Sequence, residues 1–325
     1  MAKYLVTGAA GFIASRVSDL LLDSGHTVIG LDNMNNAYDV RLKEYRLGRL
    51  VERPNFQFHQ QDIADHARLR EIIAENGPFD AVFNLAARAG VRASVENPWA
   101  FVETNTTGTL NLLEACREFQ IPKFILASTS SIYGANAPQP TPETADSSAP
   151  LQPYAASKKA AEVMAHSYHY LYGLDVTVFR YFTVYGPAGR PDMVMFRFAQ
   201  WIREGRPVLL NGDGNQSRGF TYVDDIARGT IAGLKPLGYE VINLGGHESI
   251  TINEMIERLE ELTGCKANVQ NLPFHKADML SNLADVSKAR RLLGWEAQVD
   301  LVEGMRRLVD WYLAERAWAS QVITE

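Results

Sequence analysis

The feature of this sequence that most restricts its fold is a repeated alternation of short apolar runs and longer helical patterns. Runs rich in β-branched residues predict strands buried on both faces, and they occupy residues 3–7, 27–32, 56–60, 80–85, 123–128 and 175–181. Between them, segments such as 12–23 and 110–119 have helical periodicity, and a long helix is expected to begin near Tyr154. Strands and helices that alternate in this way form right-handed βαβ units. We therefore predict an α/β fold with a doubly wound parallel sheet of the Rossmann type.

The pattern changes after residue 181. Glycines and prolines cluster at 186–191 and again at 211–214, which is typical of loops that bind ligands. Thr251 and Glu254 fit a capping box that opens an amphipathic helix, and a strand is expected near 240–244. We expect residues 1–180 to form an NAD-binding domain to which the chain returns at about 219–246. Residues 181–325 are expected to form mainly a smaller C-terminal α/β lobe that binds substrate. The proline-rich connection at 138–153 is interpreted as a surface excursion or a lid.

Charge and cysteine content narrow the possible functions. The 325 residues include 32 Lys and Arg against 38 Asp and Glu, a formal net charge of −6. This balance disfavours binding to nucleic acid or to anionic membranes, because both need a basic excess. Cys116 and Cys265 are the only cysteines and do not have metal-ligand spacing, so we expect no disulfide framework, no metal site and a cytoplasmic location. There is no run of 18 apolar residues, and no transmembrane helix is predicted.

A glycine turn joins the first predicted strand to the first helix. Gly8 and Gly11 allow backbone N–H groups and the helix N-terminus to approach a pyrophosphate. Asp32 lies 21 positions beyond Gly11, where a carboxylate accepts hydrogen bonds from the adenosine ribose and repels a ribose phosphate, which favours NAD over NADP. Ala14 stands where a third glycine is common, and we expect its methyl group to be tolerated. A glycine turn taken alone is a weak signal, and the register of strand, helix and Asp32 strengthens it.

Further cofactor contacts are expected at the carboxyl ends of strands, where open α/β sheets bind ligands. Each of these positions also has a plain interpretation as an ordinary strand end. The remaining predicted cofactor residues next to the turn and at strand ends are Ala10, Phe12, Ile13, Asn33, Asp62, Ile63, Leu85, Ala86 and Ala87.

Tyr154 and Lys158 are four residues apart on the long predicted helix, and they therefore share one face. A tyrosine has a pKa of about 10, and a nearby ammonium group favours the phenolate, which can act as a base. Tyr-x-x-x-Lys is common by chance and also fits a solvated helix face. Thr129, in the Ser/Thr run that ends the fifth strand, makes the pair informative, because its hydroxyl can orient the alcohol that the phenolate deprotonates.

These motifs and their order resemble the extended short-chain dehydrogenase/reductase family over essentially the whole chain. Within that family the sequence is most similar to the UDP-glucuronate 4-epimerases. The segments that carry this closer similarity are 31–33, 38–43, 89–92, 181–187 and 190–193. The resemblance implies that Tyr154 removes the proton of the carbon-4 hydroxyl while hydride passes to bound NAD. The resulting 4-keto sugar then takes the hydride back on its other face. It also places Tyr181 beside the cofactor.

A uronate substrate adds a requirement, because its 4-keto intermediate is a β-keto acid that loses carbon dioxide readily. Fixed donors must hold the carboxylate away from the geometry of decarboxylation. Ser130, Ser131 and Thr183 supply hydroxyl groups, and Arg190 supplies a charged fork. The family comparison implies that the related decarboxylases and dehydratases have a glutamate at the position of Ser131, so its absence argues against both reactions. The alternative roles are strand-end capping for the serines and an ion pair with Asp192 for Arg190.

The resemblance also implies the residues that bind the uridine diphosphate. Arg218 matches an arginine that contacts the diphosphate, although the acidic residue that usually follows it is replaced by Gly219. The family has a second arginine shortly before Asp278, which is itself a predicted substrate residue. In this sequence His275 stands at the position of that arginine, and Lys276 next to it is expected to supply the charge instead. Arg92 is a further candidate for an anionic group or for a structural ion pair.

Three functions stay open at this point. The first is UDP-glucuronate 4-epimerisation, and the second is 4-epimerisation of neutral UDP-hexoses or N-acetylhexosamines, with UDP-glucuronate decarboxylation as a weaker variant. The third is a non-catalytic NAD-binding scaffold, which the intact set of Thr129, Tyr154 and Lys158 argues against. The resemblance further implies a homodimer that packs the helices near 100–118 and 154–172.

Overall fold

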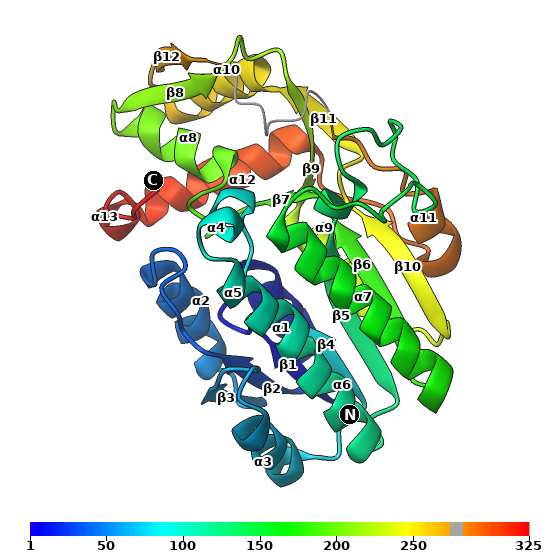
Figure 1. Ribbon diagram of the computed structural model, residues 1–325. Coiled ribbons are helices and arrows are strands. Elements are labelled where there is room, and N and C mark those ends of the chain that lie inside the picture. Colours follow the sequence, from blue (N-terminus) through cyan, green and yellow to red (C-terminus); the bar gives the residue numbers. More distant parts are fainter. Residues whose placement is uncertain (274–281, 325) are drawn as a thin grey trace.

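The computed structural model describes residues 1–273 and 282–324, and a seven-stranded parallel sheet forms its centre (Figure 1). Across the sheet the strands are β10 (Tyr239–Leu244), β6 (Asp175–Tyr181), β5 (Lys123–Thr129), β4 (Ala81–Asn84), β1 (Lys3–Thr7), β2 (Thr27–Asp32) and β3 (Phe56–Gln60). The strand order runs outward in one direction from β1 to β3 and in the other direction from β4 to β10. The point of reversal lies between β1 and β4, where doubly wound sheets bind their ligands. The predicted fold class is confirmed.

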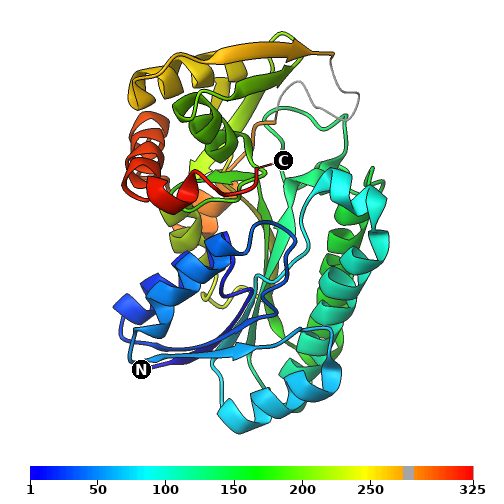
Figure 2. The same cartoon turned by 90° about the vertical axis from the view of Figure 1, so that its left-hand side faces the viewer.

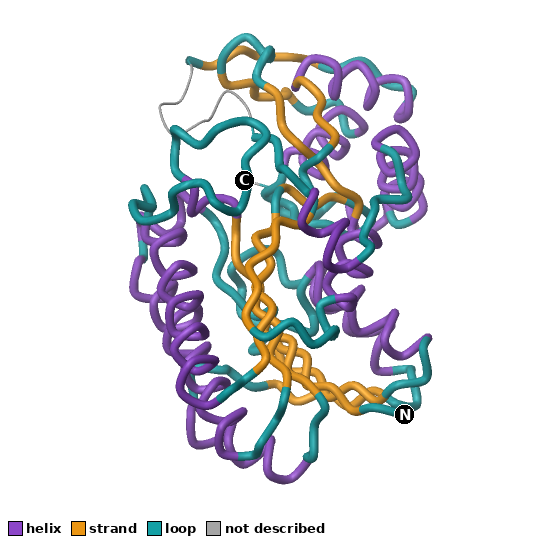
Figure 3. The backbone as a smooth tube through the Cα atoms, turned by 90° about the vertical axis from the view of Figure 1, so that its right-hand side faces the viewer, coloured by secondary structure: helices purple, strands orange, loops and turns teal. Residues whose placement is uncertain are grey.

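Helices cover both faces of the sheet, as the edge-on view in Figure 3 shows. One face carries α1 (Phe12–Asp23), α2 (Arg41–Val51), α9 (Val223–Ala232) and α11 (Ser287–Leu293). The other carries α3 (His66–Asn76), α6 (Gly108–Glu118) and α7 (Pro153–Tyr172). Successive residues of a strand point to opposite faces, so Val6 enters the core under α1 while Leu5 enters the core under α6. This two-sided burial is why the strands read as continuous apolar runs.

A smaller lobe lies beyond the carboxyl ends of the strands (Figures 1 and 2). It contains a three-stranded sheet, β11 (Glu248–Thr251), β9 (Ser217–Tyr222) and β7 (Thr183–Tyr185), and a two-stranded sheet, β12 (Asn268–Leu272) and β8 (Pro207–Asn211). Its helices are α8 (Val194–Arg203), α10 (Ile252–Thr263), α12 (Leu301–Ala314) and α13 (Arg316–Ala319). The predicted capping box is present, since Thr251 and Glu254 exchange hydrogen bonds at the start of α10.

Short helical segments lead into α6 and α7. The chain leaves β4 through α4 (Val91–Glu96), α5 (Pro98–Phe101) and a π-helical turn, η1 (Val102–Thr107), before α6 begins. A 3₁₀ turn, η2 (Ser130–Tyr133), follows β5 directly. These segments bring residues from several crossovers to one end of the sheet.

The structure differs from four expectations about the elements. Strand β3 is an edge strand with exposed and half-buried residues, so the prediction that it is buried on both faces was wrong. The predicted strand 80–85 is shorter as β4, and the predicted helix 110–119 begins two residues earlier as α6. Of the segment expected to return over 219–246, β10 joins the large sheet and α9 packs against α1, whereas β9 belongs to the separate sheet with β7 and β11.

Among the described residues, no helix is both long enough and apolar enough to span a lipid bilayer.

Candidate active site

The turn between β1 and α1 requires glycine at both predicted positions. Gly8 has a φ of +70°, and a Cβ there would lie 2.8 Å from the Ala86 Cα. At Gly11, a Cβ would lie 2.7 Å from the Gly8 carbonyl oxygen, to which the Gly11 N–H donates a hydrogen bond of 2.7 Å. The backbone therefore forms a tight cradle at the N-terminus of α1, which fits a dinucleotide pyrophosphate. Ala14, in place of a third glycine, is buried in the core under α1.

Asp32 is fixed at the end of β2. Its carboxylate accepts hydrogen bonds from the Ala10 N–H (3.2 Å) and the Met34 N–H (2.8 Å), and it forms a 3.0 Å ion pair with Lys43 of α2. Both side chains are buried. Lys43 was not identified from the sequence, although it lies one helix beyond Asp32. The ion pair holds the carboxylate where an adenosine ribose would lie in this fold.

The other predicted cofactor positions lie around this turn in different environments. The Asn33 side chain donates a 2.6 Å hydrogen bond to Asp62, so the ends of β2 and β3 are tied together. Ile63 points into the core under α6. Phe12 is buried and Ile13 is half-buried at the start of α1. After β4, Leu85 and Ala86 are half-buried while Ala87 is exposed, and Tyr181 is buried at the end of β6.

Tyr154 and Lys158 lie in the first two turns of α7, as the spacing predicted. The buried Lys158 ammonium donates a 2.9 Å hydrogen bond to the Ala127 carbonyl oxygen of β5. Burial lowers its pKa to about 8, and the charge of Glu162 opposes this shift. Desolvation raises the pKa of Tyr154, while a hydrogen bond with Thr129 and the charge of Arg190 oppose the rise. Thr129, Tyr154 and Arg190 therefore lie together, and the cation that favours the phenolate in this structure is Arg190.

The candidate carboxylate donors surround the same end of the sheet. Ser131 donates its backbone N–H to the Thr129 hydroxyl at 3.2 Å, and their side chains are also 3.2 Å apart. Ser130 and Thr183 are half-buried. Arg190 forms the ion pair with Asp192 that was its alternative role, with contacts of 2.5 and 3.1 Å. Arg190 is also close enough to Tyr154 for its charge to act on the pKa of that hydroxyl. The same guanidinium therefore pairs with Asp192 and faces Tyr154.

A buried ion pair beneath Lys158 was missed in the sequence. Glu162, one turn further along α7, accepts hydrogen bonds from Arg180 of β6 at 2.8 and 3.0 Å and from Ser128 at 2.6 Å. The signal was available, because a glutamate four residues after the lysine shares its helix face. Arg180 also donates to the Glu143 carbonyl oxygen at 3.2 Å, so the pair connects α7 to the proline-rich connection.

That proline-rich connection is anchored near its start. The Asn243 N–H of β10 donates to the Glu143 carboxylate at 2.8 Å, and the Asn243 side chain donates to the Thr141 carbonyl oxygen at 2.9 Å. Thr141 also forms a β-bridge with Ala284. Residues 141–143 are therefore held against β10 and the segment after residue 281.

The predicted contacts to the nucleotide and to other anionic groups include arginines on different elements. Arg218 lies on β9, half-buried, and Gly219 has no room for a side chain, since a Cβ would lie 2.4 Å from the Gly246 carbonyl oxygen. An acidic side chain at this position would therefore not fit the backbone geometry of this protein. Arg92 is exposed on α4, and its charge, together with burial, lowers the pKa of Arg197 on α8, which the sequence did not single out. His275, Lys276 and the predicted substrate residue Asp278 lie outside the described residues.

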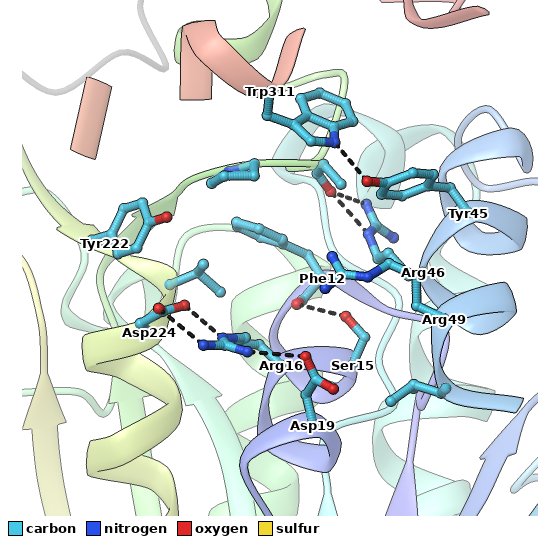
Figure 4. A pocket seen from close by; sticks show the side chains of 14 residues that line it. Phe12, Ser15, Arg16, Asp19, Tyr45, Arg46, Arg49, Tyr222, Asp224 and Trp311 are labelled. Atoms are coloured by element: carbon cyan, nitrogen blue, oxygen red, sulfur yellow. Dashed lines mark hydrogen bonds and ion pairs between the residues drawn. The ribbon is translucent and has the colours of Figure 1, made fainter. Parts of the chain in front are cut away.

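The pocket drawn in Figure 4 is not this site. It has a volume of about 250 Å³ and lies between α1, α2, the 187–188 loop and α12. Its lining residues, among them Phe12, Arg46 and Trp311, do not include Thr129, Tyr154 or Lys158. Phe12 is the one predicted cofactor residue among them, whereas Thr129 ends β5 and Tyr154 and Lys158 lie at the start of α7.

The doubly wound sheet, the glycine cradle and the Tyr154–Lys158 pair define a dinucleotide-dependent enzyme site. The comparisons agree, because residues 4–245 match the NAD dependent epimerase/dehydratase family. The chain belongs to this family.

Several relatives and solved structures resemble the whole chain. A UDP-glucuronate 4-epimerase of Thermodesulfobacterium geofontis is 56% identical over 312 residues, 96% of each protein. The UDP-glucuronic acid 4-epimerase of Bacillus cereus, solved with UDP-glucuronic acid and NAD, has a TM-score of 0.88 at 37% identity, with 96% of this chain and 99% of that chain covered. A UDP-glucose 4-epimerase of Thermotoga maritima, solved with UDP-glucose, has a TM-score of 0.89 at 35% identity, with 97% and 99% covered. The family resemblance inferred from the motifs is confirmed.

Proposed function

We propose that this protein interconverts UDP-glucuronate and UDP-galacturonate by epimerisation at carbon 4, with bound NAD and without decarboxylation. The observation that carries the proposal is the Arg190 guanidinium, whose charge acts on the Tyr154 hydroxyl. A cation beside the catalytic base is suited to a sugar that carries a carboxylate. The 56% identical relative bears this activity in its name.

The residues of the site have separate tasks in this reaction. NAD, when bound, accepts a hydride from carbon 4 and returns it. Tyr154 takes the proton of the carbon-4 hydroxyl and later gives it back, and the Thr129 hydroxyl orients that alcohol. Lys158, with its pKa near 8, supplies a positive charge on the same helix face near neutral pH. General acid–base groups of this kind contribute about 10²- to 10⁴-fold to a rate.

Retention of the carboxylate depends on the donors around it. Arg190, Ser130, Ser131 and Thr183 are proposed to hold the carboxylate so that its bond to carbon 5 does not align with the ketone at carbon 4. Ser131 is itself held by the Thr129 hydroxyl, and a serine at this position supplies no carboxylic acid. We propose that this combination suppresses loss of carbon dioxide.

A second candidate, 4-epimerisation of neutral UDP-hexoses, is favoured by the likeness to the Thermotoga maritima enzyme solved with UDP-glucose. The two candidates differ at the sugar end only. The Arg190 charge favours the uronate, because a guanidinium forms a charge-assisted hydrogen bond with a carboxylate and only a weaker, neutral one with a hydroxymethyl group.

The direct test is incubation of the purified protein with UDP-glucuronate and no added NAD, with products resolved by proton NMR. We expect UDP-galacturonate to appear until the two sugars reach equilibrium. UDP-xylose or free NADH as the main product contradicts the proposal. Turnover of UDP-glucose but not of UDP-glucuronate would support the second candidate.

We also propose a cytoplasmic homodimer, in which residues 1–180 mainly bind NAD and residues 181–325 mainly bind the UDP-sugar. The segments α5, η1, α6 and α7 pack against one another on one side of the sheet. The supporting observation for the dimer is a set of exposed apolar side chains on these segments. They are Trp99, Val102, Leu110, Val163, Tyr170 and Leu171. Large exposed apolar groups gathered on neighbouring helices are typical of an interface. Light scattering during size-exclusion chromatography measures the mass directly, and a monomer contradicts this part of the proposal.

A further inference from the structure

Arg46 of α2 is a buried arginine to which the proposed reaction gives no part. All five of its N–H donors have acceptors. Nε donates to the Ala188 carbonyl oxygen at 2.9 Å, and one terminal nitrogen donates to the carbonyl oxygens of Ala188 (2.7 Å) and Gly189 (3.2 Å). The other terminal nitrogen donates to the Ala10 carbonyl oxygen at 3.0 Å and to the Tyr38 hydroxyl at 2.8 Å.

These acceptors are all neutral oxygens. Over residues 1–273 and 282–324, Arg46 forms no ion pair with a carboxylate, although its side chain is buried between the Phe12 and Tyr38 rings. Burial of a guanidinium without a counter-charge is costly. A long apolar side chain would fill the same space without that cost, so the hydrogen bonds of Arg46 must supply something that packing alone does not.

The loop bound by Arg46 has a backbone that needs external support. Ala188 has a φ of +50°, in the left-handed region that side-chain-bearing residues rarely adopt. Gly186 has a φ of +151°, and a Cβ there would lie 2.9 Å from the Val223 side chain. Conformations of this kind persist where the surroundings fix them. Two of the five hydrogen bonds of Arg46 reach the Ala188 carbonyl oxygen, and Figure 4 shows the guanidinium aimed at this loop.

The same loop leads directly into Arg190. Gly189, whose carbonyl oxygen accepts one of these hydrogen bonds, is the residue before it. Tyr38, which accepts the fifth, lies close enough to Arg190 for the two groups to interact electrostatically. Ala10 belongs to the glycine turn of the cofactor site. The Arg46 guanidinium therefore joins the dinucleotide turn at Ala10 to Ala188 and Gly189, the two residues that precede Arg190.

We infer that Arg46 is a positioning residue that fixes Arg190 against the cofactor turn and thereby supports binding of the sugar carboxylate. The inference rests on the proposed function, because it assigns Arg190 to the sugar carboxylate. Arginine is required at this position, because lysine has three donors on a flexible stem and cannot reproduce a planar five-donor arrangement.

The test compares the NAD-bound wild-type protein with Arg46→Lys by calorimetric titration of UDP-glucuronate and of UDP. UDP lacks the sugar and its carboxylate and therefore reports only on the nucleotide end. We expect Arg46→Lys to weaken UDP-glucuronate binding about tenfold or more, while the Kd for UDP changes less than about twofold. Arg49→Lys, on the exposed face of the same helix, is the matched control and should change neither value.

Equal weakening of both ligands, or of neither, would overturn the inference, because the first shows a general structural role and the second shows no role. Tyr38→Phe provides a milder variant that removes one acceptor without removing the charge. It should weaken UDP-glucuronate binding about threefold and leave UDP binding unchanged, and a change confined to UDP would also contradict the inference. The wild-type conversion of UDP-glucuronate is measured first, so that its absence identifies failure of the proposed function itself.

Discussion

The proposed cofactor end of this site, at the glycine turn, and its proposed sugar end, at Arg190, are built in different ways. At the cofactor end, the shape comes from the backbone of one short turn, where Gly8 and Gly11 pack so closely that a methyl group would overlap neighbouring main-chain atoms. At the sugar end, the shape comes from side chains of distant segments, such as Arg46 and Ala188, which are 142 residues apart. A backbone site is encoded locally, whereas a site built from long-range contacts is encoded only in the fold.

The largest expected effect lies between the two ends and tests whether both serve one reaction. Tyr154→Phe removes the proton-transfer group and keeps the ring that packs edge-on against Phe101. We expect turnover of UDP-glucuronate to fall about 10³-fold, with NAD content and substrate Kd nearly unchanged. Tyr172→Phe, at the exposed end of the same helix, is the control. Retained turnover in Tyr154→Phe would show that the chemistry uses another group.

The next prediction concerns a variant that should disrupt NAD binding alone. Gly8→Ala places a Cβ 2.8 Å from the Ala86 backbone, so the turn must open and the purified protein should carry at least about tenfold less NAD, a loss of about 1.4 kcal/mol in binding. Gly25→Ala is a matched control, because Gly25 has a similar φ of +78° but nothing within 4 Å of its Cβ. It should cost stability through backbone strain and keep its NAD. Equal NAD loss in both variants would show that the strained φ, rather than the close approach of the Cβ to Ala86, causes the loss of NAD.

The third prediction concerns a variant that should disrupt the proposed contact to the sugar alone. Arg190→Met removes the cation, and kcat/KM for UDP-glucuronate should fall about 100-fold, while NAD content stays at the wild-type level. The charge of Arg190 also lowers the pKa of Tyr154. Its removal should therefore raise that pKa and move the acidic limb of the pH–rate profile to higher pH. Rates measured from pH 6 to 9 check the shift, and a limb that moves to lower pH contradicts the assignment.

The same contrast separates the elements and residues that could be predicted from the sequence from those that could not. Strands buried on both faces produce apolar runs, which is why β1, β2 and β6 were predicted to the residue. The exposure of β3 was missed, because strand order across a sheet is not visible in a local pattern. Residues of the glycine turn and the Tyr154–Lys158 pair were found from their spacing.

The missed residues are those whose partners come from other segments. Lys43 beside Asp32, Arg180 beside Glu162, and Arg46 beneath the loop before Arg190 all depend on how helices lie on the sheet. No local periodicity identifies such pairs, and each became evident only from the tertiary contacts. The departure at Gly219 is of the same kind, because the Gly246 carbonyl that excludes a side chain comes from another part of the chain.

The smallest effect concerns Lys158, which both ends share. Burial lowers its pKa to about 8 in the folded protein, from 10.5. Below pH 8 the lysine is charged in both states, and the folded state carries the full desolvation cost. Between pH 8 and 10.5 the folded protein has lost this proton while the unfolded chain keeps it, so folding stability should rise with pH. Relative to Lys158→Met, the wild-type apoprotein should gain about 2 kcal/mol between pH 8 and 9.5, from about 1.4 kcal/mol per pH unit.

Urea unfolding of both apoproteins at the two pH values measures this gain, because titrations common to both proteins cancel in the difference. Parallel changes in the two proteins would show that the Lys158 ammonium is not desolvated in the folded state. A gain of the expected size that disappears when NAD is bound would sharpen the comparison. It would show that bound NAD keeps Lys158 protonated. The cofactor would then set the charge beside Tyr154 before the sugar binds.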